Sequence, residues 1–122
     1  MIVYYSHPKT YKNSAESEQD IGLLEALGYG VISPYDPKFS DLWQEEGIKF
    51  GKVLVDMCDY VAFRPLSNGK IGAGVGKELG WAIELQKPIL EMPSAFPFDE
   101  NTLKERLLSI DETVEFFNTI GK

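Results

Sequence analysis

One glutamate in this sequence stands where a carboxylate could do chemistry. Glu78 follows a stretch with four closely spaced glycines: Gly69, Gly72, Gly74 and Gly76. Residues 74–86 have the pattern of a helix, and its dipole favours an ionised carboxylate in the first turns. Such a group can attack an anomeric carbon as the nucleophile of a retaining glycosyl transfer and form a covalent sugar ester. The alternative is that Glu78 only complements the helix dipole.

The glycine-rich stretch itself predicts either an anion site or a structural turn. Glycines let a ligand approach the backbone, and the amides at the start of the next helix would point at it. The stretch lacks both the Gly-Lys-Ser/Thr end of a phosphate loop and the glycine spacing of a dinucleotide fingerprint. Arg64 and Lys70 flank it, and either could neutralise a ligand phosphate or be an ordinary solvated cation.

Other side chains could contact a substrate or simply pack. His7, the only histidine, is either a general acid or phosphate contact, or a structural hydrogen-bonding group. Tyr35 and Trp43 could stack on a base or belong to the packing of the fold. Trp81, three residues past Glu78, is expected to pack against the sheet or a partner subunit.

Strands and helices that alternate along the chain must position these residues. Short apolar runs predict strands at residues 2–5, 31–33, 58–65 and 89–92. Segments with helical spacing follow at residues 15–30, 41–57, 74–86 and 109–121. Residues 103–110 fit a helix, a strand or a short piece of each. The pattern predicts an α/β fold: an open parallel five-stranded sheet with helices on both faces, in one domain of residues 1–122.

In such a sheet, ligands bind beyond the carboxyl ends of the strands. Three loops would gather there, at residues 6–14, 33–40 and 64–76. The loop that holds His7 and the glycine-rich loop would therefore face the same crevice.

Composition restricts the possible partners. The 122 residues carry a net charge of −7 and no basic run, which argues against binding to a nucleic-acid polymer. No apolar run is long enough for a membrane span, and residues 1–10 do not resemble a secretory signal. The single cysteine, Cys58, and the lack of histidine and cysteine at ligand spacing predict a cytoplasmic protein without metal or cofactor.

Residues 72–90, "GAGVGKELGWAIELQKPIL", resemble the signature of the nucleoside 2-deoxyribosyltransferase superfamily, which includes the 2'-deoxynucleoside 5'-phosphate N-hydrolases. "IVYYSHP", residues 2–8, and "DYVAF", residues 59–63, resemble two of its strands. The resemblance implies a flavodoxin-like fold and a homodimer or larger homo-oligomer. It also implies hydrolysis or base exchange at the N-glycosidic bond of a (deoxy)nucleoside or nucleoside 5'-phosphate.

Carried over by position, Glu78 matches the nucleophile of the superfamily. Tyr4, or alternatively Tyr5, matches the tyrosine that hydrogen-bonds the nucleophile, and His7 is the third candidate catalytic residue. The candidate substrate-binding residues are Tyr5, Ser6, Arg64, Lys70, Gly72, Gly74 and Gly76.

The sequence departs from the superfamily pattern at three places. An aspartate is replaced by Gly51, a small polar or acidic residue by Gly72, and a Gly-Ser or Gly-Ala pair by His7-Pro8. The group that would protonate the departing base is therefore not identified. An inactive nucleotide-binding module of the same fold is the alternative function, and a protein whose acidic helices bind a partner is a third.

Overall fold

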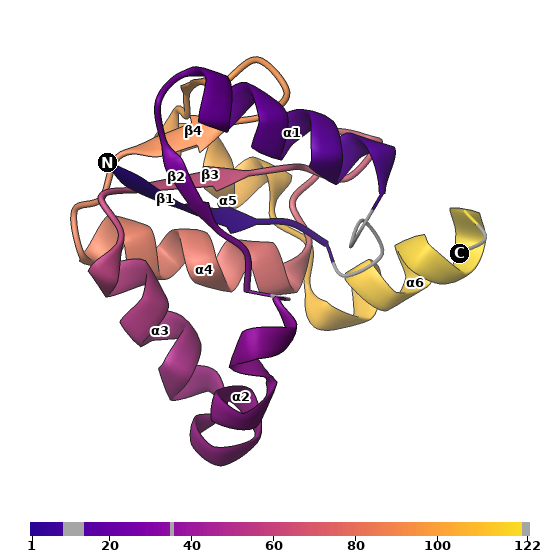
Figure 1. Cartoon of the computed structure of the whole chain (residues 1–122). Coiled ribbons are helices and arrows are strands. Elements are labelled where there is room, and N and C mark those ends of the chain that lie inside the picture. Colours follow the sequence, from indigo (N-terminus) through magenta and orange to yellow (C-terminus); the bar gives the residue numbers. More distant parts are fainter. Residues whose placement is uncertain (9–13, 35, 121–122) are drawn as a thin grey trace.

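The computed structural model describes residues 1–8, 14–34 and 36–120, and its centre is a five-stranded sheet (Figure 1). The strands are β1 (Ile2–Ser6), β2 (Gly30–Ile32), β3 (Tyr60–Phe63), β4 (Ile89–Glu91) and β5 (Phe96–Pro97). Their order is β2-β1-β3-β4-β5, and the four predicted strands are all parallel. The fifth strand is antiparallel to β4. A turn directly after β4 returns the chain along the same edge, and an antiparallel pair needs no crossover helix.

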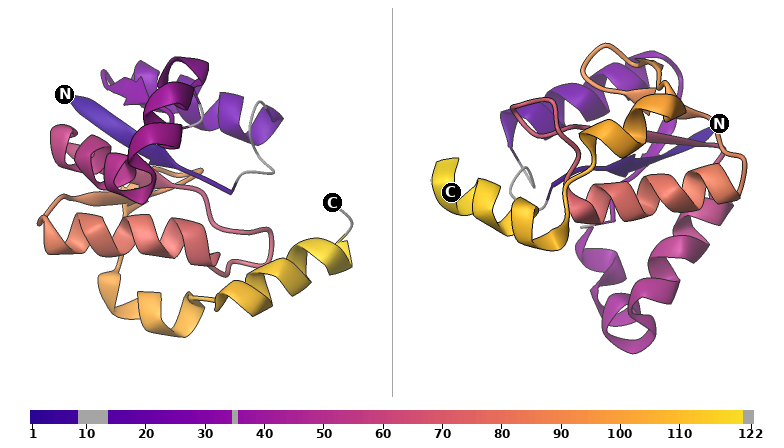
Figure 2. Two further views of the ribbon diagram at one scale, coloured as in Figure 1. Left: turned by 90° about the horizontal axis from the view of Figure 1, so that it is seen from below. Right: turned by 180° about the vertical axis from the view of Figure 1, so that it is seen from behind.

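Helices cover both faces of the sheet, as predicted. They are α1 (Ala15–Ala26), α2 (Ser40–Glu46), α3 (Ile48–Met57), α4 (Ala73–Glu84), α5 (Leu103–Arg106) and α6 (Ile110–Ile120). In Figure 1, α1 lies over one face, and α3 and α4 lie over the other. Figure 2 shows α6 extending away from the sheet beside the first turn of α4. No helix in the described ranges is both long and apolar enough to cross a membrane.

The sheet separates two hydrophobic cores because side chains alternate along each strand. Val3 and Tyr5 of β1 pack with Leu24 of α1 on one face. Tyr4, between them, belongs to the core on the opposite face, where α3 and α4 supply Val55, Leu79 and other apolar side chains. Consecutive tyrosines of β1 therefore reach opposite sides of the sheet.

The predicted helical segment of residues 41–57 is two helices. Gly47 has a φ of 61°, a conformation that favours glycine, and it ends α2 and precedes α3. Helical spacing on both sides of Gly47 conceals this break in the sequence. The break lets Trp43 of α2 turn back toward α3 and pack near Gly51.

Residues 103–110, left open by the sequence, contain a short piece of each structure. The one-turn helix α5 is followed by Leu107, which forms an isolated parallel bridge with Ile71. A capping box then starts α6: the Ser109 amide donates to Glu112 Oε1 at 3.0 Å, and the Glu112 amide donates to Ser109 Oγ at 3.1 Å. These contacts lower the pKa of the Glu112 carboxyl.

Candidate active site

Glu78 lies in the second turn of α4, and its carboxylate is hydrogen-bonded to two hydroxyls of β1. Tyr4 donates to Oε2, and Ser6 donates to Oε1 at 2.8 Å. Tyr4 and Ser6 are two residues apart on a strand, so their side chains point to the same face of the sheet. The expected pairing of Tyr4 with Glu78 is therefore present in the structure, whereas Tyr5 faces the other side.

The environment of Glu78 shifts its pKa in two opposing directions. Burial raises the pKa to about 6, and the hydrogen bonds from Tyr4 and Ser6 oppose that rise because they stabilise the ionised form. Within the described residues no lysine or arginine forms an ion pair with this carboxylate. At neutral pH Glu78 is mainly ionised, with both oxygens oriented and no ion pair among the described residues. These are the properties of a positioned nucleophile.

A cavity of about 710 Å³ opens over Glu78 at the carboxyl ends of the strands. All three loops that were predicted to gather there contribute to its walls. They supply His7 and Pro8, residues 34–40 in part, and Gly72 with Gly74. The remaining walls come from α2, α4 and α6. The volume lies within the range of small-molecule binding sites in proteins.

The four glycines before Glu78 have different roles. Gly74 lines the cavity, and an added Cβ would meet nothing within 4 Å. Gly72 also lines it, at the N-cap of α4. At Gly76, by contrast, a Cβ would lie 2.2 Å from Leu107 Cδ1, so a side chain here would need Leu107 to move, and Gly76 is not part of the cavity wall. Gly69 has a positive φ of 82° and forms a turn.

His7 is buried at the end of β1 and also lines the cavity. Its Nδ1 lies 2.9 Å from the Pro8 carbonyl oxygen, which makes Nδ1 the protonated nitrogen in this geometry. Its ring lies 4.7 Å from the ring of Tyr5, at 31°. Burial lowers the pKa of His7 below its usual value, so the neutral imidazole is favoured at neutral pH.

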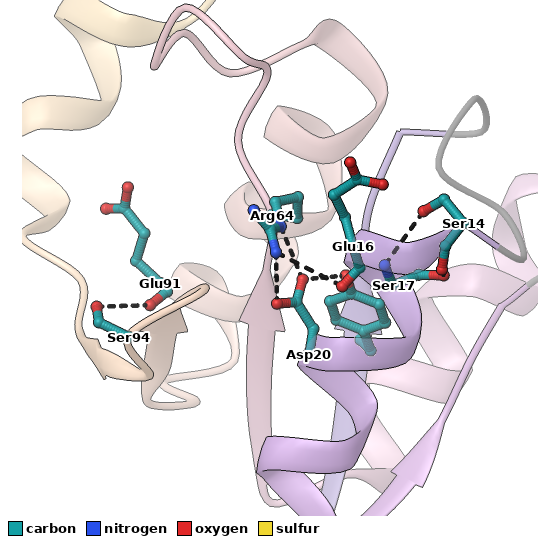
Figure 3. Close-up of polar contacts among 8 residues, drawn as sticks. Ser14, Glu16, Ser17, Asp20, Arg64, Glu91 and Ser94 are labelled. Carbon is teal, nitrogen blue, oxygen red and sulfur yellow. Dashed lines mark hydrogen bonds and ion pairs between the residues drawn. The ribbon is translucent and has the colours of Figure 1, made fainter.

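Arg64, a candidate phosphate ligand, lies on the α1 face and is paired with a buried carboxylate there (Figure 3). Its Nε donates to Asp20 Oδ2 at 2.8 Å, and its Nη2 donates to Asp20 Oδ1 at 2.7 Å. The Tyr5 hydroxyl donates to the same carboxylate. These contacts raise the pKa of Arg64, while burial and Asp20 raise the pKa of Tyr5. Neither Arg64 nor Tyr5 lines the cavity.

The second predicted cation also lies outside the cavity. Lys70 is exposed, and its Nζ is 3.4 Å from the carbonyl oxygen of Glu105. Within the described residues, Lys77 is the lysine that does line the cavity. Sequence reasoning missed it because an exposed lysine next to Glu78 has the pattern of an ordinary solvated position.

Sequence reasoning also missed several other residues that line the cavity. Asp36, Trp81 and Thr113 all line the cavity, together with the predicted Trp43. Tyr35 lies outside the described residues. Within the described ranges, no group of three or more histidine, cysteine, aspartate or glutamate side chains could hold a metal ion.

The position at which the superfamily has an aspartate has no room for a side chain here. A Cβ on Gly51 would lie 2.9 Å from Trp43 Cη2 and 3.0 Å from Trp81 Cζ3. The two indole rings fill the space into which a side chain at Gly51 would project. An acid cannot be accommodated at this position unless the rings move.

Comparisons with known proteins found no matching family model and no matching curated protein. Solved structures do match. The CMP N-glycosidase BcmB of Clostridium botulinum is 16% identical with a TM-score of 0.55, over 98% of this chain and 99% of that one. A 2-deoxyribosyltransferase of Bacillus psychrosaccharolyticus is 20% identical with a TM-score of 0.53, over 88% of this chain and 82% of that one. This protein therefore has the nucleoside deoxyribosyltransferase fold, which the resemblance in residues 72–90 predicted.

Proposed function

We propose that the protein cleaves the N-glycosidic bond of a nucleoside or nucleoside 5'-phosphate through a covalent sugar ester on Glu78. The observation that carries this proposal is the ionisable Glu78 carboxylate, which two hydroxyls orient beside a cavity large enough for a nucleotide. The fold of a CMP N-glycosidase and of a 2-deoxyribosyltransferase supports chemistry at an N-glycosidic bond. Hydrolysis and base exchange share the same first step.

In that step a Glu78 oxygen attacks C1' of the sugar while the bond from C1' to the base nitrogen breaks. The bond's electron pair leaves with the base, which takes up a proton from solvent or from an acid in the cavity. Tyr4 and Ser6 orient the carboxylate before the attack, which lowers the entropic part of the barrier. Each carboxylate oxygen can accept two hydrogen bonds, so a lone pair remains for the bond to C1'.

In the second step a water molecule, or the nitrogen of a second base, attacks C1' and releases the Glu78 carboxylate. We assign His7 to this step as a general base for the water. A histidine with a lowered pKa is mainly neutral at pH 7, and a neutral imidazole accepts a proton more readily than it donates one. Two displacements at C1' leave its configuration unchanged.

The start of α4 would hold the 5' end of the substrate. The amides of the first turn of a helix attract anions. Gly74 brings this turn to the cavity without a covering side chain, and Lys77 adds a cation to the same wall. A nucleoside 5'-phosphate is therefore the better candidate substrate than an uncharged nucleoside.

A direct test incubates the protein with a panel of ribo- and deoxyribonucleosides and their 5'-monophosphates, and measures free base by chromatography. We expect release from at least one member and none from Glu78→Gln. The matched control is Glu84→Gln, the same chemical change on an exposed glutamate of α4 that pairs with Lys52, and it should retain full activity.

The covalent step has its own measurement. A substrate with fluorine at C2' slows breakdown of the ester, so intact-mass spectrometry should show the wild-type protein heavier by one fluorinated sugar, and Glu78→Gln unchanged. If no nucleoside or nucleotide releases base, yet several bind equally well to wild type and Glu78→Gln, the protein is a binding module and the proposed activity is wrong.

A further inference from the structure

Both tryptophans of the sequence line the cavity, and their rings meet at Gly51. Trp43 comes from α2, and Trp81 lies one turn beyond Glu78 on α4. Gly74, in the first turn of α4, lies one turn before Glu78. The cavity therefore has an aromatic end and a helix-start end, and the candidate nucleophile lies between them.

The two indole rings are held in place by the fold. Trp43 Nε1 donates a hydrogen bond to the Pro34 carbonyl oxygen at 2.8 Å, and its ring meets Phe50 edge-on at 5.2 Å and 87°. Both rings pack against Gly51: a Cβ at this residue would lie 2.9 Å from Trp43 Cη2 and 3.0 Å from Trp81 Cζ3. Both are partly buried, so each keeps some surface exposed. Rings that are already fixed lose little conformational entropy when a ligand binds.

We propose that Trp43 and Trp81 form the subsite for the leaving base, and that they recognise a planar heteroaromatic ring by contact with their π faces. This inference rests on the proposed function, because it places C1' of the substrate at Glu78. Stacking of a base on an aromatic side chain is possible for every base, because every base has a π face. The indole N–H of Trp43 is already used by Pro34, so this donor does not select among bases.

The subsite has a consequence for specificity. Discrimination that depends on ring area favours the larger ring system, so purines should bind more tightly than pyrimidines, and both should bind. A site built on hydrogen bonds would instead reject most bases by large factors. Gly51 contributes to this subsite, because any side chain there would displace both indole rings.

Tryptophan fluorescence measures this binding directly, since both tryptophans of the protein line the cavity. Glu78→Gln protein, which should not turn over, is titrated with adenosine, cytidine and ribose 5-phosphate. We expect both nucleosides to quench the emission, with adenosine about threefold or more tighter than cytidine. Ribose 5-phosphate, which lacks a base, should quench little. Absence of quenching by either nucleoside overturns the proposal.

Single substitutions then separate the two rings. In Trp43→Phe the remaining emission comes from Trp81, and in Trp81→Phe it comes from Trp43, so each should still be quenched. Trp43→Leu and Trp81→Leu should each weaken adenosine binding by about tenfold, measured by calorimetry, with ribose 5-phosphate binding unchanged. Phe96→Leu, which changes an exposed aromatic residue on β5, is the matched control and should bind as before.

Gly51→Ala provides an independent variant that keeps both tryptophans. Its Cβ would push the rings out of place, so adenosine binding should weaken while ribose 5-phosphate binding stays the same. Unchanged adenosine affinity in both leucine variants overturns the proposed subsite even if base release is observed. Quenching without base release leaves the subsite standing and contradicts the proposed catalysis.

Discussion

The two faces of β1 carry the same pair of groups and use them differently. On one face the Tyr4 hydroxyl donates to the carboxylate of Glu78, and on the other the Tyr5 hydroxyl donates to the carboxylate of Asp20. The two tyrosines are neighbours in the sequence, and both carboxylates come from helices that cover the sheet. The Asp20 side chain is 1% exposed and paired with Arg64, whereas Glu78 borders a cavity and has no such ion pair within the described residues.

The difference between these pairs shows how one local motif becomes structural or reactive. A buried carboxylate with a guanidinium and a hydroxyl around it has its charge balanced and its lone pairs occupied. A carboxylate with hydroxyl donors alone keeps its charge and its nucleophilic lone pairs. The guanidinium therefore distinguishes a fold-stabilising Asp20 from a candidate nucleophile at Glu78.

Substitution of each carboxylate by its amide tests this difference most strongly. Glu78→Gln should lower the rate of base release by about 10³-fold or more, because an amide cannot form the sugar ester. Asp20→Asn should change kcat of the folded protein little. The rates are measured by chromatography of free base on material shown to be folded by circular dichroism. Equal losses of activity in both variants would contradict the assignment of separate roles.

Truncation of the paired carboxylate should have the largest effect on stability. Asp20→Ala leaves the Arg64 guanidinium partly buried without its partner, so unfolding free energy should fall by about 3–5 kcal/mol. Urea denaturation provides the measurement. The reference is Glu84→Ala, which breaks an exposed ion pair with Lys52 and should cost about 1 kcal/mol or less.

The raised pKa of Glu78 should make the fold less stable as the pH rises. Its pKa goes from 4.5 to about 6 on folding, so the native state holds this proton more tightly than the unfolded chain does. The stabilising effect of protonated Glu78 is complete below pH 4.5 and is lost as pH rises through 6. Wild type should therefore lose about 2 kcal/mol relative to Glu78→Gln between pH 4 and pH 7.5, at about 1.4 kcal/mol per pH unit. The unfolding free energies are measured by urea denaturation at each pH. The same change with pH in both proteins would contradict this prediction.

Removal of a single hydroxyl on each face is the finest test. Tyr4→Phe removes a hydrogen bond that lowers the pKa of Glu78, so the acidic limb of the pH–rate profile should move above pH 6. Tyr5→Phe should leave that limb in place and lower the unfolding free energy by about 1–2 kcal/mol. The measurements are a pH–rate profile and a denaturation curve for each variant. A shifted limb in Tyr5→Phe would show that the two faces are coupled.

Local patterns predicted the elements, and the family resemblance predicted one important contact. The strand β1 and the helix after the glycine-rich stretch are recognised from neighbouring residues alone. The four predicted strands and the helix α6 lie where expected. The pairing of Tyr4 with Glu78 spans 74 residues and was reached through the resemblance of residues 72–90, not from spacing.

Contacts between distant residues explain what the sequence did not show. Arg64 looked available for a phosphate because its partner, Asp20, lies 44 residues earlier in the sequence. Asp20 belongs to α1, which covers the face of the sheet opposite to α4 and Glu78. Gly76 looked like part of a ligand loop, yet Leu107 from beyond β5 occupies the space of its missing side chain. Nothing near Gly51 indicates that two tryptophans from different helices close over it.

The contact of α6 with the rest of the molecule has a consequence for the timing of assembly. The Ala73 amide donates to Thr113 Oγ1 at 3.0 Å, and Thr113 and Phe117 line the cavity, while Ile110 and Val114 of the same helix stay exposed. Because α6 follows every strand in the chain, both cores can close before it docks. It can also open locally while the sheet stays folded. A bound substrate that touches Thr113 or Phe117 should then slow amide hydrogen exchange in α6 while leaving exchange in β1 unchanged.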